Sequence, residues 1–224
     1  METIVLSIGG SVILSEDADI SFFKKLINLL KKLSKRYKIH VVVGGGKVAR
    51  SYIKLGRKLN LDEKTLDELG IEITRVNAKL LTNIIGISNK EIPLTTENAK
   101  KINKPIIIMG GTIPGHSTDM VGAELAEKVK ADRLIIATNV DGIYDKDPNK
   151  YSDAKQLNEV TIEDLIKKYG TKWHAAGSNL AIDGPALKII HRAKIPTFVV
   201  NGRRLDQLEK AMTNQSFDGT KIKI

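Results

Sequence analysis

The sequence has 224 residues, no cysteine and a formal net charge of +10, from 36 lysines and arginines against 26 acidic residues. A chain of this length can bury a substantial core, so we expect one domain or two closely joined lobes. The missing cysteines exclude disulfides and thiolate nucleophiles, and the 4% content of aromatic residues argues against a stacking platform for single-stranded nucleic acid.

The first half of the chain alternates short apolar runs with amphipathic segments. The apolar runs predict strands at residues 4–8, 39–43 and 105–109. Helices are expected after the N-cap candidate Ser21, from the glycine-rich turn to about residue 60, across 61–86 and over 96–102. In the second of these helices, the apolar face is predicted to consist of Val48, Tyr52, Leu55 and Leu59.

The second half continues the alternation. Helices are predicted at 120–129 with Thr118 as N-cap, at 161–169 with Thr161 as N-cap, at 183–193, and at 205–212 as the element that closes the chain. Strands are expected at 134–137 and 196–200, with a loop-like region over 141–158. Trp173 is assigned to packing or an interface. The pattern predicts an α/β fold around a mostly parallel sheet.

A glycine-rich turn joins the expected strand 39–43 to the helix that follows it. Gly44, Gly45 and Gly46 leave backbone N–H groups accessible at the positive end of a helix, where Lys47 and Arg50 add full charges. Small or polar residues also follow three other expected strands: Gly9-Gly10-Ser11, Gly110-Gly111-Thr112 and Thr138-Asn139. Because ligands bind at the carboxyl ends of strands in open α/β sheets, these turns together predict a phosphate site.

Two familiar phosphate-binding patterns are excluded. A Walker A loop would need glycine at position 41 and Ser or Thr after Lys47, whereas the sequence has Val41 and Val48. The dinucleotide fingerprint G-x-G-x-x-G is also missing.

The four landmark segments of the amino-acid kinase superfamily are similar to Ile8–Ser11, Val43–Gly46, Thr118-Asp119 and Thr138–Tyr144. Within that superfamily the chain resembles the archaeal-type uridylate (UMP) kinases, through Gly44–Arg50, Gly70–Ala78, Pro114–Asp119 and Asp145–Pro148. The resemblance implies a three-layer αβα sandwich in a single domain over 1–224. It places the phosphate acceptor in a lobe of about 1–130 and ATP in a lobe of about 131–224.

The resemblance also implies the reaction, in which ATP phosphorylates UMP to UDP. The ATP contacts carried over from the family are Gly9, Gly10, Gly45, Arg50, Thr138, Asn139, Tyr144 and Asp147. The UMP contacts are Gly44, Asp67, Gly115, His116, Ser117, Thr118, Asp119, Met120 and Val121. Asp119 and Asp183 are catalytic candidates that help Mg²⁺ arriving with ATP, and no direct protein cage for the metal is expected.

One position departs from the superfamily pattern. Many members have a lysine two residues before the first glycine pair, and this chain has Ser7 there. Lys47 lies on the neighbouring turn, so we expect it to replace the missing charge and to be catalytic. Arg75 and Asn77 are equally consistent with structural roles, Asp67 with a surface acid, and Asp183 with a helix cap.

Other functions remain open from the residues. A kinase of the same fold acting on isopentenyl phosphate is one alternative, although no histidine occurs among residues 47–50. A non-catalytic nucleotide sensor is another, since Ser7 cannot neutralise a phosphoryl group. The expected partners are ATP and UMP, with no nucleic acid and no membrane, because the lysine pairs lie on solvated helix faces. The resemblance suggests a homohexamer, and we expect a cytoplasmic protein.

Overall fold

The computed structural model describes residues 1–13, 19–148, 150–172 and 182–224, so Trp173 lies outside the described residues. A seven-stranded sheet has the order β3-β2-β1-β4-β8-β9-β7 among the described strands. Its members are β1 (Glu2–Ile8), β2 (Tyr37–Val43), β3 (Ile106–Met109), β4 (Arg133–Thr138), β7 (Glu159–Thr161), β8 (Thr197–Asn201) and β9 (Thr220–Lys223). Neighbours are parallel except β8 and β9. The short strands β5 (Ile143–Tyr144) and β6 (Gln156–Leu157) pair separately.

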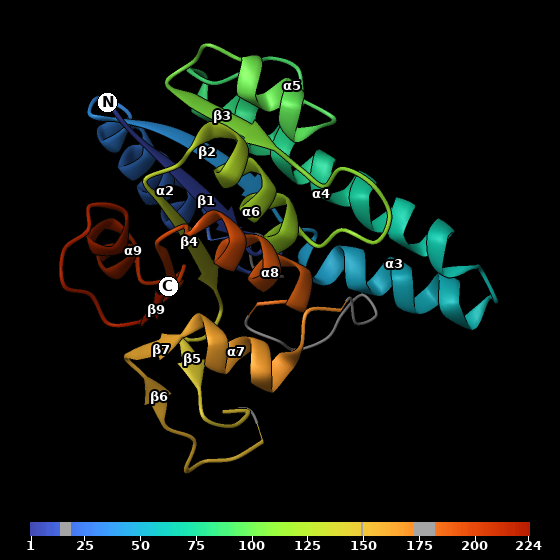
Figure 1. Cartoon of the computed structure of the whole chain (residues 1–224). Coiled ribbons are helices and arrows are strands. Elements are labelled where there is room, and N and C mark those ends of the chain that lie inside the picture. The colour runs from blue at the N-terminus through green and yellow to red at the C-terminus, as the bar shows by residue number, and fades with distance from the viewer. Residues whose placement is uncertain (14–18, 149, 173–181) are drawn as a thin grey trace.

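Helices cover both faces of the sheet (Figure 1). They are α1 (Gly10–Ile13), α2 (Ile20–Leu33), α3 (Gly46–Lys58), α4 (Glu63–Ile85), α5 (Thr96–Lys101), α6 (Thr118–Val129), α7 (Ile162–Tyr169), α8 (Gly184–Ala193) and α9 (Leu205–Met212). One buried apolar cluster joins the sheet to α1, α2, α4 and α9, and a second joins it to α5, α6, α7 and α8. The predicted three-layer sandwich is therefore confirmed. Within the described part of the chain, no helix has both the length and the apolar composition to cross a membrane.

The order of the strands places a crevice beside β1. From β1 the chain builds outward through β2 and β3 on one side, and then returns to add β4 and β8 on the other side. A reversal of this kind separates the loops at the carboxyl ends of the central strands and leaves room for a ligand between them. The fold thus directs the turns after Ile8, Val43 and Thr138 toward one space.

Two predicted helix caps are wrong by one or two residues. Asp19, not Ser21, is the N-cap of α2, and its carboxylate accepts a hydrogen bond from the N–H of Phe22. Ser117, not Thr118, is the N-cap of α6, because its hydroxyl is the one that reaches the N–H of Met120. In each case several capping residues occur together, and only the residue three positions before a free N–H can satisfy it. The predicted cap Thr161 is confirmed.

One other expectation about the fold is also wrong. The helix at 205–212 does not close the chain, because β9 follows it and pairs with β7 and β8. Each of β7 and β9 contains a single apolar residue among three or four positions, which gives little strand signal. The apolar stripe of α3 does not face the core, since its members are 44–66% exposed: Val48, Tyr52, Leu55 and Leu59. The residues that α3 buries are Gly46, Ala49 and Gly56.

His40 is an ionisable residue in the middle of the apolar sheet. It lies in β2 opposite Val5 of β1 and Ile107 of β3, and its side chain is fully buried. Neither ring nitrogen has a hydrogen-bond partner among the described residues. Burial, together with the nearby charge of Lys38, lowers the pKa of His40 to about 4.

The lowered pKa makes His40 a source of acid lability. The folded state resists protonation of His40, whereas the unfolded chain accepts a proton near pH 6.5, so stability is full above pH 6.5 and falls as the pH approaches 4. The loss is about 3 kcal/mol. We expect His40→Leu, which keeps the volume, to gain stability relative to the wild type by about 3 kcal/mol when urea unfolding of both proteins is compared at pH 7.5 and 4.5. The same change in stability between the two pH values in both proteins would contradict the assignment.

Candidate active site

A cavity of about 560 Å³ lies at the carboxyl ends of the central strands. It brings together residues that the sequence assigned to two different ligands. The lining includes these predicted ATP contacts: Gly9, Gly10, Gly45, Arg50, Thr138, Asn139, Tyr144 and Asp147. It also includes these predicted UMP contacts: Gly44, Asp67, His116, Ser117, Thr118 and Asp119. One continuous cavity is therefore lined by residues of both the predicted ATP site and the predicted UMP site.

Some predicted site residues do not line this cavity. Val121 is fully buried in the apolar core beneath α6, and Met120 packs against the same core. The N–H of Gly115 donates to Asp67, 2.7 Å away, so this glycine holds the loop. Lys47 lies exposed on the first turn of α3, and Asp183 lies behind Ser117.

The floor of the cavity is formed by two glycine turns in direct backbone contact. A Cβ on Gly10 would lie 2.1 Å from the amide nitrogen of Gly46, and Gly46 itself has a φ of +65°. Side chains other than hydrogen cannot fit here, and the left-handed φ favours glycine independently. The buried side chain of Asn77 donates to the carbonyl of Gly44 at 2.8 Å and keeps the second turn in place.

Helix α4 fixes the loop after β3, on the predicted acceptor side. The hydroxyl of Thr74 accepts the N–H of Gly111 at 2.6 Å, and the guanidinium of Arg75 donates to the carbonyl of Thr112 at 3.0 Å. Arg75 and Asn77 thus hold backbone of the site, which the sequence left undecided. Asp67 accepts a hydrogen bond from the N–H of Gly115 in the loop before α6, and it also lines the cavity.

Two carboxylates lie close together beside the cavity. The hydroxyl of Ser7 donates to Asp119 at 2.8 Å, and the hydroxyl of Ser117 donates to Asp183. Asp183 also accepts the N–H of Ala186 at 2.8 Å and so caps α8. The structure therefore shows the capping role directly, and the hydrogen bond from Ser117 connects this cap to the cavity wall.

The environment of these acids favours their protonated forms. Burial of the carboxylate of Asp119, and secondly the charge of Asp183, raises the pKa of Asp119 to about 7, while the hydrogen bond from Ser7 opposes the shift. Part of the Asp119 residue still lines the cavity. Burial also raises the pKa of Asp183, opposed by the hydrogen bonds from Ser117 and Ala186. A cation entering the cavity would relieve the repulsion between the two acids.

Asp119 and Asp183 are the residues of this site whose chemistry suits a metal ion. Among the described residues, no group of three or more acidic or histidine side chains is placed to hold an ion. Asp119 and Asp183 supply two hard oxygen ligands, which suits Mg²⁺ that keeps most of its ligands from water and phosphate. The residues present fit a metal that arrives with a nucleotide.

Lys168 of α7 is a cavity residue that sequence reasoning missed. Its ammonium donates to the carbonyl of Asp145 at 2.7 Å and lines the cavity beside Tyr144. In the sequence it belongs to a Lys-Lys pair that looks like a solvated helix face, and no spacing rule connects it to the loop 23 residues earlier.

The chain is similar to known proteins over nearly its whole length. The profile of the amino acid kinase family matches residues 2–201. The chain belongs to the amino acid kinase family. A uridylate kinase of Methanobrevibacter smithii is 43% identical over 222 residues, which cover 98% of each chain. One from Methanocaldococcus jannaschii is 45% identical over 204 residues, 89% of this chain and 90% of its own.

Solved structures of this amino acid kinase family have the same fold. The crystal structure of uridylate kinase from Archaeoglobus fulgidus superposes with a TM-score of 0.87 at 37% identity, covering 99% of this chain and 100% of that one. UMP kinase from Ureaplasma parvum, at 22% identity and a TM-score of 0.81, shares the fold. The predicted family membership is confirmed.

The raised pKa of Asp119 predicts a cost in stability at neutral pH. The unfolded chain loses this proton near pH 3.8 and the folded protein near 7, so the contribution of Asp119 to stability falls as the pH rises from 4 to 7. With metal chelated and no nucleotide, we expect Asp119→Asn to stabilise the protein by about 4 kcal/mol at pH 8 and to be neutral at pH 4. Urea unfolding at both pH values measures the difference. Destabilisation at pH 8 would contradict this account.

Proposed function

We propose that this chain transfers the γ-phosphoryl group of ATP to UMP, giving UDP and ADP, as a step in pyrimidine nucleotide synthesis. The observation that carries the proposal is the single cavity lined by both sets of predicted nucleotide contacts. The similarity to uridylate kinases over nearly the whole chain supports the same acceptor. Phosphorylation of a nucleoside monophosphate is therefore the activity that these relatives support best.

The two nucleotides enter the cavity from opposite sides in this proposal. UMP lies between α4 and the loop before α6, where Asp67 is placed to accept hydrogen bonds from ribose hydroxyls. ATP lies against the loop after β4, with Tyr144 beside the adenine. The phosphates meet over the glycine turns, whose N–H groups and helix N-termini favour negative charge.

Catalysis then depends on position and charge. The acceptor is a phosphate oxygen that is already ionised, so no residue has to remove a proton from it. In-line transfer between two phosphates held in contact needs little beyond alignment and neutralisation of the transferring group. Mg²⁺ bound to ATP supplies charge neutralisation, and Asp119 and Asp183 are the residues that would hold it. Arg50 and Lys168 add positive charge on the cavity wall.

We also propose that the chain assembles into a homo-oligomer, a hexamer by resemblance to other UMP kinases. Exposed apolar side chains on two helices that pack together support this: the stripe on α3, and Val76, Leu80 and Ile84 on α4. Exposed apolar side chains in such number are typical of a protein interface. Sedimentation equilibrium measures the mass directly, and a monomer of 24.7 kDa at micromolar concentration would contradict the proposal.

The acceptor is tested by measuring ADP release with ATP and Mg²⁺. The panel contains UMP, CMP, dUMP, isopentenyl phosphate, aspartate and glutamate. We expect strong turnover with UMP and no turnover with the last three compounds, since the cavity offers contacts to a ribose and a phosphate together. Preferred turnover with isopentenyl phosphate would replace the acceptor but keep the ATP site. ATP binding without any turnover would indicate a nucleotide sensor.

Lys47 is proposed to supply the charge that Ser7 cannot. It directly follows Gly46, which touches the first glycine turn, and its long side chain starts at the rim of the site. We expect Lys47→Ala to lower kcat by about 100-fold, the range for loss of one charged group at a transferring phosphoryl. Lys54→Ala, on the exposed part of the same helix, is the matched control. Unchanged kcat in Lys47→Ala would refute this role.

A further inference from the structure

The ATP-side wall of the cavity is anchored by residues from the far end of the chain. This wall is the segment 138–144, which joins β4 to β5 and lines the cavity. The N–H of Gly202 donates to the carbonyl of Thr138 at 2.8 Å, and the N–H of Ile143 donates to the hydroxyl of Thr220 at 2.8 Å. Both ends of the wall are therefore held from 60 to 80 residues away in sequence.

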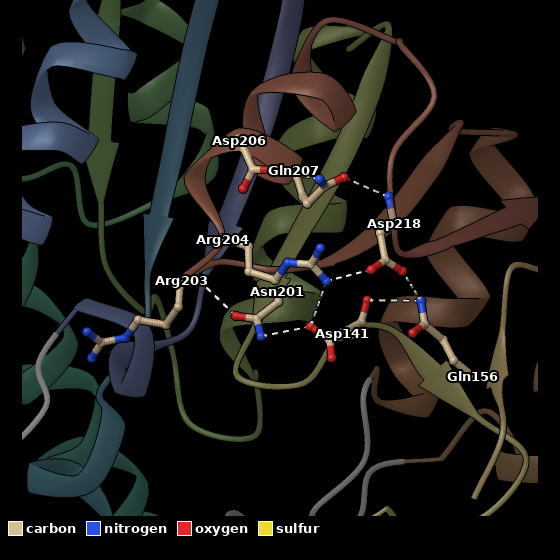
Figure 2. A network of polar contacts seen from close by, with 8 residues as sticks. All are labelled: Asp141, Gln156, Asn201, Arg203, Arg204, Asp206, Gln207 and Asp218. Carbon is tan, nitrogen blue, oxygen red and sulfur yellow. Dashed lines mark hydrogen bonds and ion pairs between the residues drawn. The ribbon is translucent and has the colours of Figure 1, made fainter.

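Asp141 is the anchor in the middle of the wall. Its carboxylate does not line the cavity but turns toward the C-terminal segment, where it accepts from the side-chain amide of Asn201 at 3.0 Å. The same oxygen faces the guanidinium of Arg204 at 3.4 Å. Figure 2 shows these side chains converging behind the wall. The wall is thus held by its outer side, away from the ligand.

Arg204 connects this anchor to a second carboxylate. Its guanidinium binds Asp218 at 2.5 Å, and Asp218 in turn accepts from the side-chain amide of Gln156 at 3.1 Å. The N–H of Asp218 donates to Gln207 at 2.8 Å, which ties the network to α9. Figure 2 shows Arg204 reaching into this network while its neighbour Arg203 points away. One guanidinium therefore lies between two carboxylates from separate parts of the chain.

The charges of this network extend to the cavity. Burial, followed by the negative charges of Asp141 and Asp218, raises the pKa of the Tyr144 hydroxyl. Both carboxylates therefore act on a residue of the cavity wall even with Arg204 in place. Without the guanidinium their charge would no longer be offset, and it would oppose a ligand as negative as ATP.

We propose that Arg204 is a positioning residue for ATP. It holds the wall 138–144 through Asp141, and it neutralises Asp141 and Asp218 behind that wall. The inference rests on the proposed function in one respect, namely that ATP is the nucleotide bound against this wall. Arg204 does not line the cavity and touches no substrate in this proposal. Its effect is confined to the donor side, because its partners lie behind the loop after β4 and not behind α4.

The test compares two arginine–carboxylate pairs. Arg204→Ala removes the network's cation, and Arg192→Ala removes an arginine that binds Glu127 at 2.6 Å on the surface of α8 and α6. For Arg204→Ala we expect the KM for ATP to increase by about 10-fold, which is the effect of losing one charge-assisted contact. The KM for UMP is expected to stay within about twofold of the wild-type value. Arg192→Ala leaves both KM values unchanged. A purely structural role would weaken both substrates together.

A direct measurement of ATP-analogue binding tests the role of Arg204 independently of whether UMP is the acceptor. Calorimetric titration of the wild type and Arg204→Ala with a non-hydrolysable ATP analogue measures the donor side without any acceptor. A rise in Kd of about 10-fold for Arg204→Ala supports the positioning role even if UMP is not phosphorylated. Arg204→Lys keeps a positive charge in the network but lacks the planar guanidinium that binds Asp141 and Asp218 together, so we expect about a threefold rise in Kd, and this variant keeps the test available if Arg204→Ala does not fold. Kd values within twofold of wild type in both variants would overturn the proposal.

Discussion

The backbone contact between the two glycine turns is the constraint on which the rest of the site depends. Parallel pairing of β1 with β2 brings Ile8 and Val43 into register, so the turns that follow them must pass through the same space. Only glycine at positions 10 and 46 allows that approach. The result is a floor of backbone N–H groups, on which phosphates can rest without any side chain between them.

The loops that form the cavity walls are held mainly by hydrogen bonds on the side that faces away from the cavity. Asn77 and Arg75 hold the proposed acceptor side from α4, and the C-terminal segment holds the proposed donor side through Asp141. These side chains fix backbone loops and leave the cavity itself free for ligand. An arrangement of this kind pre-organises a site for phosphoryl transfer, where alignment contributes more than any acid or base.

Stability and function oppose one another at Asp119. Its carboxylate is buried beside Asp183 and costs stability at neutral pH, where the proposed reaction would use it as an anion next to the metal and phosphates. His40 has the opposite pH dependence, because its burial costs stability only as the solution becomes acidic. Between pH 4 and 7 the two effects on stability partly offset each other. Each effect is therefore measured by comparing the wild type with a variant in which only that residue is changed.

The sequence predicted those parts of the structure that have a local cause. Glycine turns after apolar runs predicted where the cavity lies, because a missing Cβ and a helix N-terminus act within a few residues. The spacing of Val48 and Leu55 predicted a helix correctly, but periodicity does not reveal what covers an apolar face, and in the structure this face is exposed. Contacts such as Arg204 with Asp141, and the strand pairing of β9, join distant segments and have no local signal.

In the proposed function, one cavity holds both nucleotides end to end. Calorimetric titration with a bisubstrate analogue, in which adenosine and uridine are joined through five phosphates, measures this directly. We expect one molecule to bind per chain, more tightly than ATP or UMP alone, and to be displaced by an excess of either nucleotide. If ATP displaced the analogue while UMP bound undisturbed beside it, the nucleotides would occupy separate sites and the proposal would be wrong.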